Sequence, residues 1–461
     1  MMKLVKDINP YIFRGYDIRG IYKTEIDEDV AYTIGKSFGS KLIDLGHSQC
    51  LVGQDNRYSS PSLTSCLITG ILSSGINVVD LGVVTTPIYY YASIKEKIGS
   101  GIMVTASHNP KNENGFKFAY DNTGNASGEI IEEFRTYTSS LKFHEGKGTL
   151  TKLDIKESYF KLIKDSISLG SRPLKVVIDC GNGTTSLFAK ELYSLFNLDL
   201  TVLFGDSNPD FPNHHPDPSV EANLTALKAK VLEINADIGL SFDGDGDRLG
   251  IIDETGSFIA ADKYMIILAR YLLPKSSNKR VLYDVKCTKA LPDEIIKLGG
   301  TPLCSRTGNS YTKRYTKEWD CLMGAELSGH IYFRDKFLGF DSGMYAGLRL
   351  LEVLSNTNQS LSSLLVGINK YYATDEIKIQ VPDSIKFKVI EEVKNYALTN
   401  HYTINEIDGV KIEFSNGWAL IRASNTGPNI TARFEGISLA IKDELYTNFM
   451  KVISNIIESL R

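Results

Sequence analysis

Cysteine is scarce in this chain, and no two cysteines stand close enough together to form a recognised motif. The 461 residues contain six scattered cysteines, and none belongs to a Cys-x-x-Cys pair. This scatter excludes a zinc ribbon and a disulfide scaffold, because both need paired cysteines at regular spacing. Isolated cysteines of this kind are small, reduced hydrophobic residues, which favours a cytoplasmic location.

Long apolar runs and an excess of one charge are also absent. No stretch is long enough to span a bilayer, and the first residues, Met1 to Asp7, hold no apolar segment of the secretory type. The 51 lysines and arginines face 55 acidic residues, which leaves a net charge of −4. We therefore expect neither nucleic acid nor a membrane as a partner. The sequence leaves the oligomeric state open, with a monomer favoured.

The glycine-rich turns of nucleotide-binding proteins are missing as well. Gly181 to Ser186 reads as a strand-to-helix turn, but it lacks the lysine of a P-loop. No Gly-x-Gly-x-x-Gly segment stands in the context that a dinucleotide site needs. We expect the Gly181 turn to serve helix entry and packing.

What the chain does contain is an alternation of short apolar runs with amphipathic segments. Predicted strands include residues 50–53, 77–81, 102–104, 175–179, 201–204, 237–240 and 280–283, and a helix is predicted over 61–74. This alternation predicts α/β units with mostly parallel strands. The length exceeds what a single core usually supports, so several domains are expected.

Polar, turn-rich breaks predict four domains, spanning residues 1–152, 153–256, 257–367 and 368–461. The first three are expected to be similar α/β units with mixed, mostly parallel sheets, arranged around a central cleft. The last differs, because a strand at 377–381 precedes a helix at 385–397, several short strands and a helix-rich end. We expect it to be a smaller α+β domain.

Asp243, Asp245 and Asp247 alternate with glycines between two apolar runs. Glycine frees the backbone to curl three carboxylates around one point, and oxygen-only ligands favour Mg²⁺ or Ca²⁺ over zinc. A calcium loop is the alternative, with Glu254 at its twelfth position. Arg248 stands where that loop needs glycine, and both flanks read as strands. A catalytic Mg²⁺ loop is therefore favoured.

Ser107 lies between an apolar run and the turn signal Asn109-Pro110. A serine that only caps a turn is the plain alternative. His108 is adjacent and Lys117 follows within ten residues. Together with an acidic metal loop, these residues favour a nucleophile for phosphoryl transfer.

Two later segments have the composition of ligand-binding segments. In residues 324–330, Glu326 and Ser328 stand two apart, so on an extended segment both can point toward adjacent sugar hydroxyls. In residues 422–428, Arg422 precedes hydroxyls, an amide and a glycine, which suits a dianionic phosphate. Each alone is open to reading as a polar turn. The proline-rich loop 211–218, with paired histidines, is expected to be structural.

Together, these four segments resemble the α-D-phosphohexomutase family, in particular its phosphomannomutase/phosphoglucomutase branch. The resemblance spans residues 13–433 and implies a phosphorylated Ser107 that joins the three aspartates as a metal ligand. It implies that Glu326 and Ser328 bind O3 and O4 of a hexose and that the loop from Arg422 binds phosphate. The full set of implied substrate-binding residues is Tyr16, Arg19, Lys286, Thr307, Gly308, Glu326, Ser328, His330, Arg422, Ser424, Asn425 and Thr426.

The implied activity is reversible conversion of hexose 1-phosphate to hexose 6-phosphate, for mannose and glucose, through a hexose 1,6-bisphosphate. Mg²⁺ is the implied cofactor and the bisphosphate the activator. The implied catalytic residues are Ser107, His108, Lys117, Arg248 and His330. A phosphoglucosamine mutase, a Mg²⁺-dependent sugar phosphatase and a non-catalytic sugar-phosphate or Ca²⁺ sensor remain as alternatives.

Two departures from the family pattern bear on these expectations. The sugar-binding segment has Leu327 where methionine is usual and one extra residue before its glutamate. Asn309 stands where relatives often carry a histidine thought to assist proton transfer. Asparagine does not titrate, so the general acid and base stay open among His330, Lys117 and Arg248.

Overall fold

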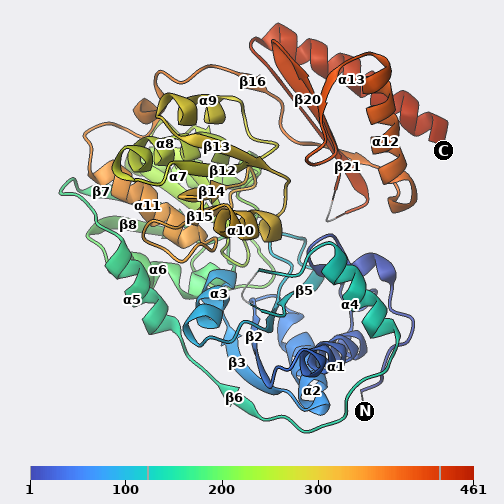
Figure 1. Cartoon of the computed structure of the whole chain (residues 1–461). Helices are drawn as coiled ribbons and strands as arrows, with labels where there is room; N and C mark the ends of the chain where they lie inside the picture. Colours follow the sequence, from blue (N-terminus) through green and yellow to red (C-terminus); the bar gives the residue numbers. More distant parts are fainter. Residues whose placement is uncertain (1, 122–123, 425–426, 461) are drawn as a thin grey trace.

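A computed structural model describes residues 2–121, 124–424 and 427–460, which form four β-sheets with their helices (Figure 1). The first sheet has the strand order β1 (Ile18–Ile21), β5 (Glu113–Ala119), β4 (Gly101–Val104), β2 (Gln49–Gln54), β3 (Asn77–Val83) and β6 (Leu150–Lys152). Its helices are α1 (Glu28–Asp44), α2 (Ser60–Ser74), α3 (Thr86–Lys95) and α4 (Glu129–Ser139). Strands β4, β2, β3 and β6 are parallel, whereas β5 runs antiparallel to β4 and β1.

Close helix packing in this first module depends on two glycines. A Cβ at Gly35 of α1 would lie 2.1 Å from the carbonyl oxygen of Leu67, and one at Gly70 of α2 would lie 2.2 Å from that of Tyr32. Only a residue without a side chain lets the two helix backbones approach this closely. The segment after α4, which carries β6, then runs along the outer edge of the module (Figure 1).

The second sheet has the order β11 (Phe258–Ile259), β10 (Leu249–Asp253), β9 (Ile238–Phe242), β7 (Leu174–Asp179) and β8 (Leu198–Leu203). Its helices are α5 (Lys156–Ser166), α6 (Ala189–Tyr193) and α7 (Thr225–Ile234). Strands β8, β7 and β9 are parallel, and β10 and β11 complete the sheet antiparallel. This sheet is therefore mixed and mostly parallel, as the sequence predicts for the α/β units.

The third sheet has the order β13 (Thr301–Ser305), β12 (Arg280–Asp284), β14 (Met323–Ala325) and β15 (Ile331–Phe333). Its helices are α8 (Ala261–Leu272), α9 (Ala290–Lys297), α10 (Asn309–Glu318) and α11 (Gly343–Ser355). Helix α11 contacts β7, β9 and β10 of the second sheet as well as β15 of the third. One continuous apolar core therefore joins the second and third modules.

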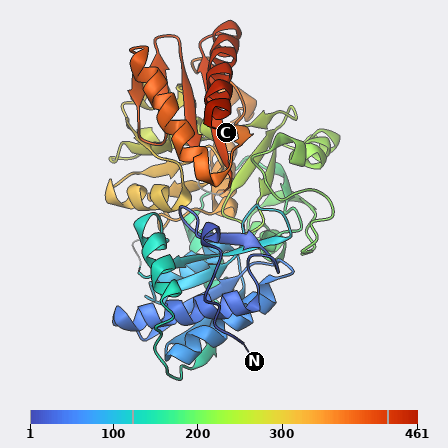
Figure 2. The same ribbon diagram turned by 90° about the vertical axis from the view of Figure 1, so that its right-hand side faces the viewer.

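The fourth sheet is wholly antiparallel, in the order β16 (Tyr372–Ala373), β21 (Asn429–Gly436), β20 (Gly417–Ala423), β19 (Val410–Phe414) and β18 (Thr403–Asn405), with β17 (Ile377–Gln380) also on β21. Helices α12 (Asp383–Thr399) and α13 (Leu439–Leu460) cover one face (Figure 2). On the other face, Trp418 and Leu420 pack against Val285 of the third module. This is the smaller α+β unit that the sequence predicts.

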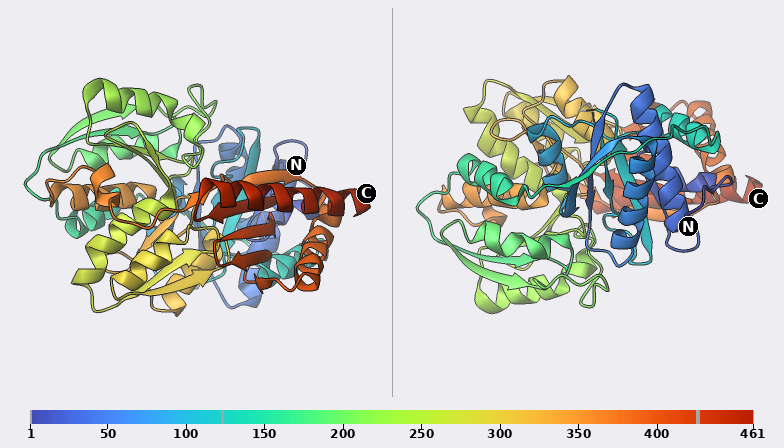
Figure 3. Two further views of the ribbon diagram at one scale, coloured as in Figure 1. Left: turned by 90° about the horizontal axis from the view of Figure 1, so that it is seen from above. Right: turned by 90° about the horizontal axis from the view of Figure 1, so that it is seen from below.

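Short 3₁₀ turns lie between these elements, at η1 (Pro10–Ile12), η2 (Thr184–Leu187), η3 (Glu221–Leu224), η4 (Leu273–Lys275) and η5 (Ser362–Leu365). Seen from above, the C-terminal module with α13 lies in front of the first module, and the second and third modules lie beside them (Figure 3). Among the described residues, no helix combines the length and hydrophobicity needed to cross a membrane.

Candidate active site

A polar cleft lies where the four modules meet. Thirteen of the residues expected to act on substrate line it together: Tyr16, Arg19, Ser107, His108, Lys117, Arg248, Lys286, Thr307, Glu326, Ser328, His330, Arg422 and Ser424. Segments far apart in the sequence thus converge on one cavity. Asn425 and Thr426, the other two members of the expected phosphate loop, lie outside the described residues.

Ser107 stands three residues after the end of β4 and is held in an unusual backbone conformation. Its φ angle is 52°, in the left-handed region that costs a non-glycine residue free energy. Its N–H donates to the Thr105 hydroxyl at 2.8 Å, and its carbonyl accepts from the Arg57 guanidinium at 2.8 Å. A Cβ at Gly244 would lie 2.5 Å from that carbonyl oxygen, so the serine loop and the acidic loop are in direct contact.

The Ser107 hydroxyl donates to Asp243 Oδ2 at 2.8 Å, and the side chain is buried. The serine is therefore joined to the acidic loop, as a nucleophile beside a metal site needs. The neighbouring His108 also lines the cleft. Burial, and then the charges of Arg248 and Arg19, hold the pKa of His108 well below its ordinary value, so this ring is neutral at pH 7.

The three aspartates lie on the tight turn between β9 and β10, and each is fully buried. One oxygen from each of Asp243, Asp245 and Asp247 falls within 4.8 Å of the other two. The Oδ1 atoms of Asp245 and Asp247 have no hydrogen-bond partner among the described residues. Burial, and then repulsion from Asp247 and Asp245, raise the pKa of Asp243 well above its ordinary value.

Three buried carboxylates, two of which have an oxygen without a hydrogen-bond partner among the described residues, are costly unless a cation joins them. An all-oxygen donor set fits a hard divalent cation such as Mg²⁺. The calcium-loop alternative fails on geometry, because Glu254 instead accepts hydrogen bonds from the Ser362 main chain and hydroxyl. The flanking elements are strands, as the sequence predicts.

Lys117, on β5, supplies a buried positive charge beside this loop. Its ammonium lies 2.8 Å from Asp245 Oδ2 and 2.8 Å from Asp247 Oδ2. Burial alone would lower the pKa of Lys117, but these two carboxylates raise it well above its ordinary value. Lys117 therefore stays charged, which suits electrostatic stabilisation better than proton transfer.

Arg248 ends the acidic loop and connects it to the sugar-binding segment. Its Nε donates to His330 Nε2 at 3.0 Å and lies 3.8 Å from Asp243 Oδ2. The main chain of Arg248 forms a β-bridge with His330, and the Leu249 N–H donates to the Gly329 carbonyl at 3.1 Å. The two loops are thus fixed to each other by backbone as well as side-chain contacts.

The expected sugar-binding residues, Glu326 and Ser328, follow β14. Glu326 is 2 % exposed, and its Oε1 has no hydrogen-bond partner among the described residues. Ser328 lies beside it, with its hydroxyl 3.4 Å from Glu326 Oε2. Burial raises the pKa of Glu326 above its ordinary value. An unpartnered carboxylate oxygen that faces a cavity can accept hydrogen bonds from a ligand's hydroxyls.

The expected phosphate-binding segment begins at the end of β20. Arg422 donates from Nε to Asp408 Oδ2 at 2.7 Å, while its Nη2 has no partner among the described residues. Buried Lys386 donates to the carbonyls of Ser424 and Gly427, at 3.0 and 3.3 Å. A guanidinium with a spare buried donor suits an anionic oxygen.

Three further expected residues, Arg19, Lys286 and Thr307, complete the walls. Arg19 is held by Asp17 at 2.7 Å, and Lys286 lies 3.2 Å from Glu376. Thr307 donates its hydroxyl to Asp284 at 3.2 Å. Gly308 does not itself line the cavity, but its φ of +137° and the nearby Tyr16 ring, 3.2 Å from where a Cβ would stand, require glycine there.

The cleft also contains residues that sequence reasoning missed. They are Asp17, Asn125, Asp217, Ser219, Ser310, Glu376, Lys378, Asn429 and Thr431. Asp217 and Ser219 had a partial signal, because Asp217 lies in the proline-rich loop 211–218 and Ser219 directly follows it. That loop was expected to be structural, yet Asp217 lines the cleft, whereas His214 Nε2 lies 3.0 Å from Asp179 Oδ2.

Four α/β and α+β modules around one polar cleft, with a buried serine joined to a carboxylate triad, define the class of α-D-phosphohexomutases. Comparison with known sequences agrees. Models of the phosphoglucomutase/phosphomannomutase α/β/α domains I, II and III match residues 10–145, 157–256 and 260–371, and the model of the C-terminal domain matches residues 376–452. The chain therefore belongs to the phosphoglucomutase/phosphomannomutase family.

Individual relatives and structures support this assignment. A Pseudomonas putida protein named phosphomannomutase/phosphoglucomutase is 40% identical over 96% of this chain and 96% of its own length. A Neisseria gonorrhoeae phosphoglucomutase is 38% identical, over 96% of this chain and 97% of its own. The crystal structure of a Burkholderia thailandensis phosphoglucomutase/phosphomannomutase family protein superposes with a TM-score of 0.89 at 35% identity and covers 98% of both chains.

Proposed function

We propose that this mutase interconverts hexose 1-phosphate and hexose 6-phosphate, for both mannose and glucose. The observation that carries the proposal is the 2.8 Å hydrogen bond from the Ser107 hydroxyl to Asp243 within the buried carboxylate triad. Similarity over nearly the whole chain to proteins named for both sugars supports the dual specificity. Glucose and mannose differ only at C2, whereas Glu326 and Ser328 are expected to bind O3 and O4.

The proposed reaction passes a phosphoryl group from Ser107 Oγ to the free hydroxyl of the substrate. The hydroxyl loses its proton as the new P–O bond forms, and the Oγ–P bond breaks, which gives a hexose 1,6-bisphosphate. The bisphosphate reverses its orientation and returns its other phosphoryl to Ser107. A trace of bisphosphate would restore any enzyme that has lost its phosphoryl group, so we propose it as the activator.

Asp243, Asp245 and Asp247 would hold Mg²⁺, which when bound supplies positive charge beside the transferring phosphoryl. Lys117 and Arg248 add fixed charge on the same side. The proton-transfer group stays open among His330, Lys117 and Arg248, all of which line the cleft. Arg422 and Ser424, together with Asn425 and Thr426, are proposed to hold the non-reacting phosphate.

Turnover of mannose 1-phosphate, glucose 1-phosphate and glucosamine 1-phosphate tests this proposal, with Mg²⁺ and a trace of hexose 1,6-bisphosphate present. Ser107→Ala should abolish isomerisation. The matched control is Ser100→Ala, because Ser100 is also buried and precedes the same strand β4 that Ser107 follows, with its hydroxyl on the Gln49 carbonyl. It should retain activity.

The alternatives predict different results. A phosphoglucosamine mutase would turn over the glucosamine ester fastest. A phosphatase would release inorganic phosphate from the bisphosphate in bulk, and a sensor would bind sugar phosphate equally well after Ser107→Ala without turnover. Absence of isomerisation with all three sugars would overturn the mutase proposal.

We also propose a cytoplasmic location and a monomeric state. The six cysteines are unpaired, which is in keeping with a reducing compartment. Cell fractionation tests the first proposal. Light scattering coupled to size-exclusion chromatography tests the second against a chain mass of 51.2 kDa.

A further inference from the structure

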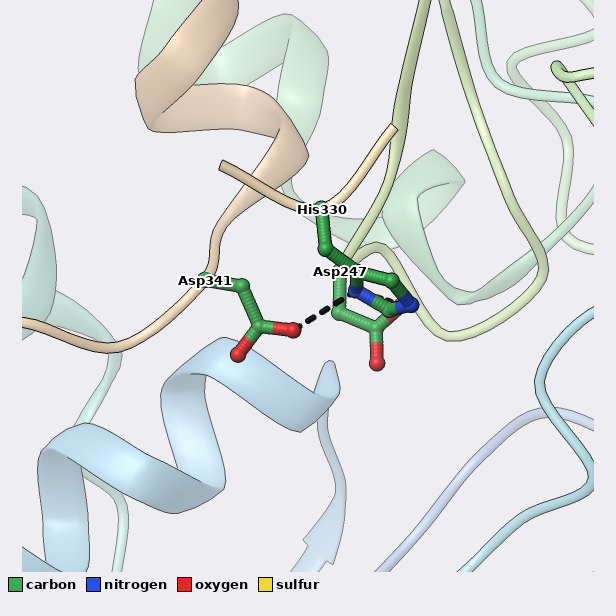
Figure 4. A group of neighbouring side chains, drawn as sticks. All are labelled: Asp247, His330 and Asp341. Atoms are coloured by element: carbon green, nitrogen blue, oxygen red, sulfur yellow. Dashed lines mark hydrogen bonds and ion pairs between the residues drawn. The ribbon is translucent and has the colours of Figure 1, made fainter. Parts of the chain in front are cut away.

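His330 lies in a buried polar cluster built from separate segments of the chain (Figure 4). Its Nδ1 lies 2.7 Å from Asp341 Oδ2 and 3.4 Å from Asp247 Oδ1. His330 stands just before β15, whereas Asp341 lies in the loop between β15 and α11. All three side chains are buried. The ring is therefore held on one edge by carboxylates while it lines the cleft.

The chemistry of the partners fixes which ring nitrogen carries the proton. An ionised carboxylate only accepts, so the short contact to Asp341 requires a proton on Nδ1. A guanidinium only donates, so the 3.0 Å contact from Arg248 Nε requires a lone pair on Nε2. The two contacts together select the tautomer that carries its proton on Nδ1 and leaves Nε2 free to accept. They also distinguish the cluster from a metal site, because a protonated Nδ1 does not ligate.

Asn309, the first residue of α10, secures the carboxylate. Its Nδ2 donates to Asp341 Oδ2, the same oxygen that accepts from His330. The orientation of this amide is determined by its partner, since a carboxylate offers no donor to the Asn309 oxygen. The residue that departs from the family pattern thus supports the carboxylate behind His330.

The contacts that orient His330 also affect the nucleophile Ser107, because Arg248 lies near both. Its Nε lies between His330 Nε2 and Asp243 Oδ2, and Asp243 accepts the hydroxyl of Ser107. A change of tautomer at His330 would present an N–H to Arg248, and two facing donors repel. A ring flip would present a C–H there, which accepts no hydrogen bond. The position of the guanidinium beside Ser107 therefore depends on the groups behind the ring.

We propose that Asp341 and Asn309 are positioning residues for catalysis, which fix His330 in the Nδ1–H tautomer and thereby hold Arg248 beside Ser107. This inference rests on the proposed function of the cleft. It assigns no contact with substrate to either residue.

Kinetics of three variants test the proposal. Asp341→Asn replaces an acceptor by a donor at one oxygen, and should lower kcat at least tenfold while KM for hexose phosphate changes less than threefold. Asn309→Asp combined with Asp341→Asn exchanges the two groups and returns a carboxylate within reach of Nδ1, which lies 3.3 Å from Asn309 Nδ2. The exchanged pair should recover most of kcat. A purely structural role predicts no such recovery.

Asp253→Asn is the matched control, because Asp253 is also buried and accepts hydrogen bonds, but stands at the far end of β10 from Arg248. It should leave kcat unchanged. An Asp341→Asn variant with wild-type kcat, or an exchanged pair no more active than Asp341→Asn alone, would overturn the proposal.

Nitrogen-15 histidine NMR of the wild-type protein gives a readout that is independent of activity. The His330 resonance, assigned by its loss in His330→Gln, should show protonated Nδ1 and unprotonated Nε2. A protonated Nε2 would overturn the positioning role even if the enzyme is a mutase. The expected tautomer in a protein that isomerises no sugar would instead support the geometry and refute the proposed function. The measurement also decides the matter if Asp341→Asn fails to fold.

Discussion

Replacing Arg57 by lysine tests whether one buried guanidinium holds the serine loop in shape. Arg57 is 1 % exposed and donates to four main-chain carbonyls within seven residues of each other. The acceptors are Ser107 at 2.8 Å, Asn109 at 2.7 Å, Pro110 at 2.7 Å and Glu113 at 3.0 Å. No other described side chain donates to all of these carbonyls.

The expected magnitude follows from counting donors. A lysine ammonium carries three N–H groups at one atom and cannot reproduce four bonds spread over two nitrogens. At least one carbonyl loses its partner, at about 1.5–3 kcal/mol for a hydrogen bond to a charged group. The positive charge is kept, so buried Asp55, which lies 3.2 Å from Arg57 Nε, still has a cation in its neighbourhood. We expect the free energy of unfolding to fall by about 2–3 kcal/mol, which is the cost of losing one such hydrogen bond.

Calorimetry and steady-state kinetics measure the two consequences separately. For a module of this size the loss corresponds to a fall in melting temperature of roughly 5–10 °C. A serine displaced by as little as ~1 Å loses its reacting geometry, so kcat/KM should fall about 10–100-fold.

Arg172→Lys is the matched control for this experiment. Arg172 also donates to main-chain carbonyls, those of Thr357 and Gln359, and pairs with Asp237, but it does not line the cleft. It should lose stability and keep wild-type turnover. If Arg57→Lys keeps both the wild-type melting temperature and wild-type kcat/KM, the reasoning about the serine loop is refuted.

Three further predictions concern metal, pH and backbone contact. Chelation with EDTA should abolish turnover and added Mg²⁺ restore it, whereas Asp245→Asn should weaken Mg²⁺ binding in calorimetry at least tenfold; full activity after exhaustive chelation would contradict this. Burial lowers but Asp179 raises the pKa of His214, for a net rise above 6.5. The ion pair of His214 with Asp179 therefore contributes fully to stability below about pH 6.5, and this contribution is lost as pH rises through the pKa of His214 in the folded protein. The melting-temperature deficit of His214→Gln should accordingly be larger at pH 5.5 than at pH 9, and an equal deficit would refute the pairing. Gly343→Ala places a Cβ 2.3 Å from the Arg248 carbonyl oxygen, so kcat should fall at least tenfold; an unchanged kcat would show that α11 can shift freely.

Most of the fold and the reacting loops follow from local patterns in the sequence. Ser107 and the three aspartates stand where apolar runs end, and the structure places them at the ends of β4 and β9. Chains with this pattern bring such loops to one edge of each sheet, because parallel strands end together. The expected sugar and phosphate segments also converge on the cleft. Their roles, and the domain boundaries at 152, 256 and 367, stay predictions.

What the sequence could not reveal is the set of single residues whose partners are distant along the chain. Arg57 holds a loop 50 residues away, and Asp408 holds Thr307 across 101 residues. Asp341 carries no motif of its own and is recognisable only once His330 lies beside it. Helix α11 packs on two sheets at once, so no local pattern assigns it to one module. Such pairings are decided by tertiary packing and not by periodicity.

The reacting centre is built as one rigid unit, and this constrains how the substrate must behave. The Thr86 N–H donates to the Asp245 carbonyl at 2.9 Å, and the Gly343 N–H donates to the Gly246 carbonyl at 3.0 Å. With the bridge between Arg248 and His330, these bonds tie the acidic loop to three neighbouring segments. A centre held in this way cannot move between two hydroxyls of one bound sugar. Under the proposed function the sugar itself must turn, and the residues that bind the sugar and its phosphate must accept both orientations. Recognition of two adjacent hydroxyls near the middle of the ring meets that requirement, because these groups stay close to the axis of rotation while the two phosphates exchange places.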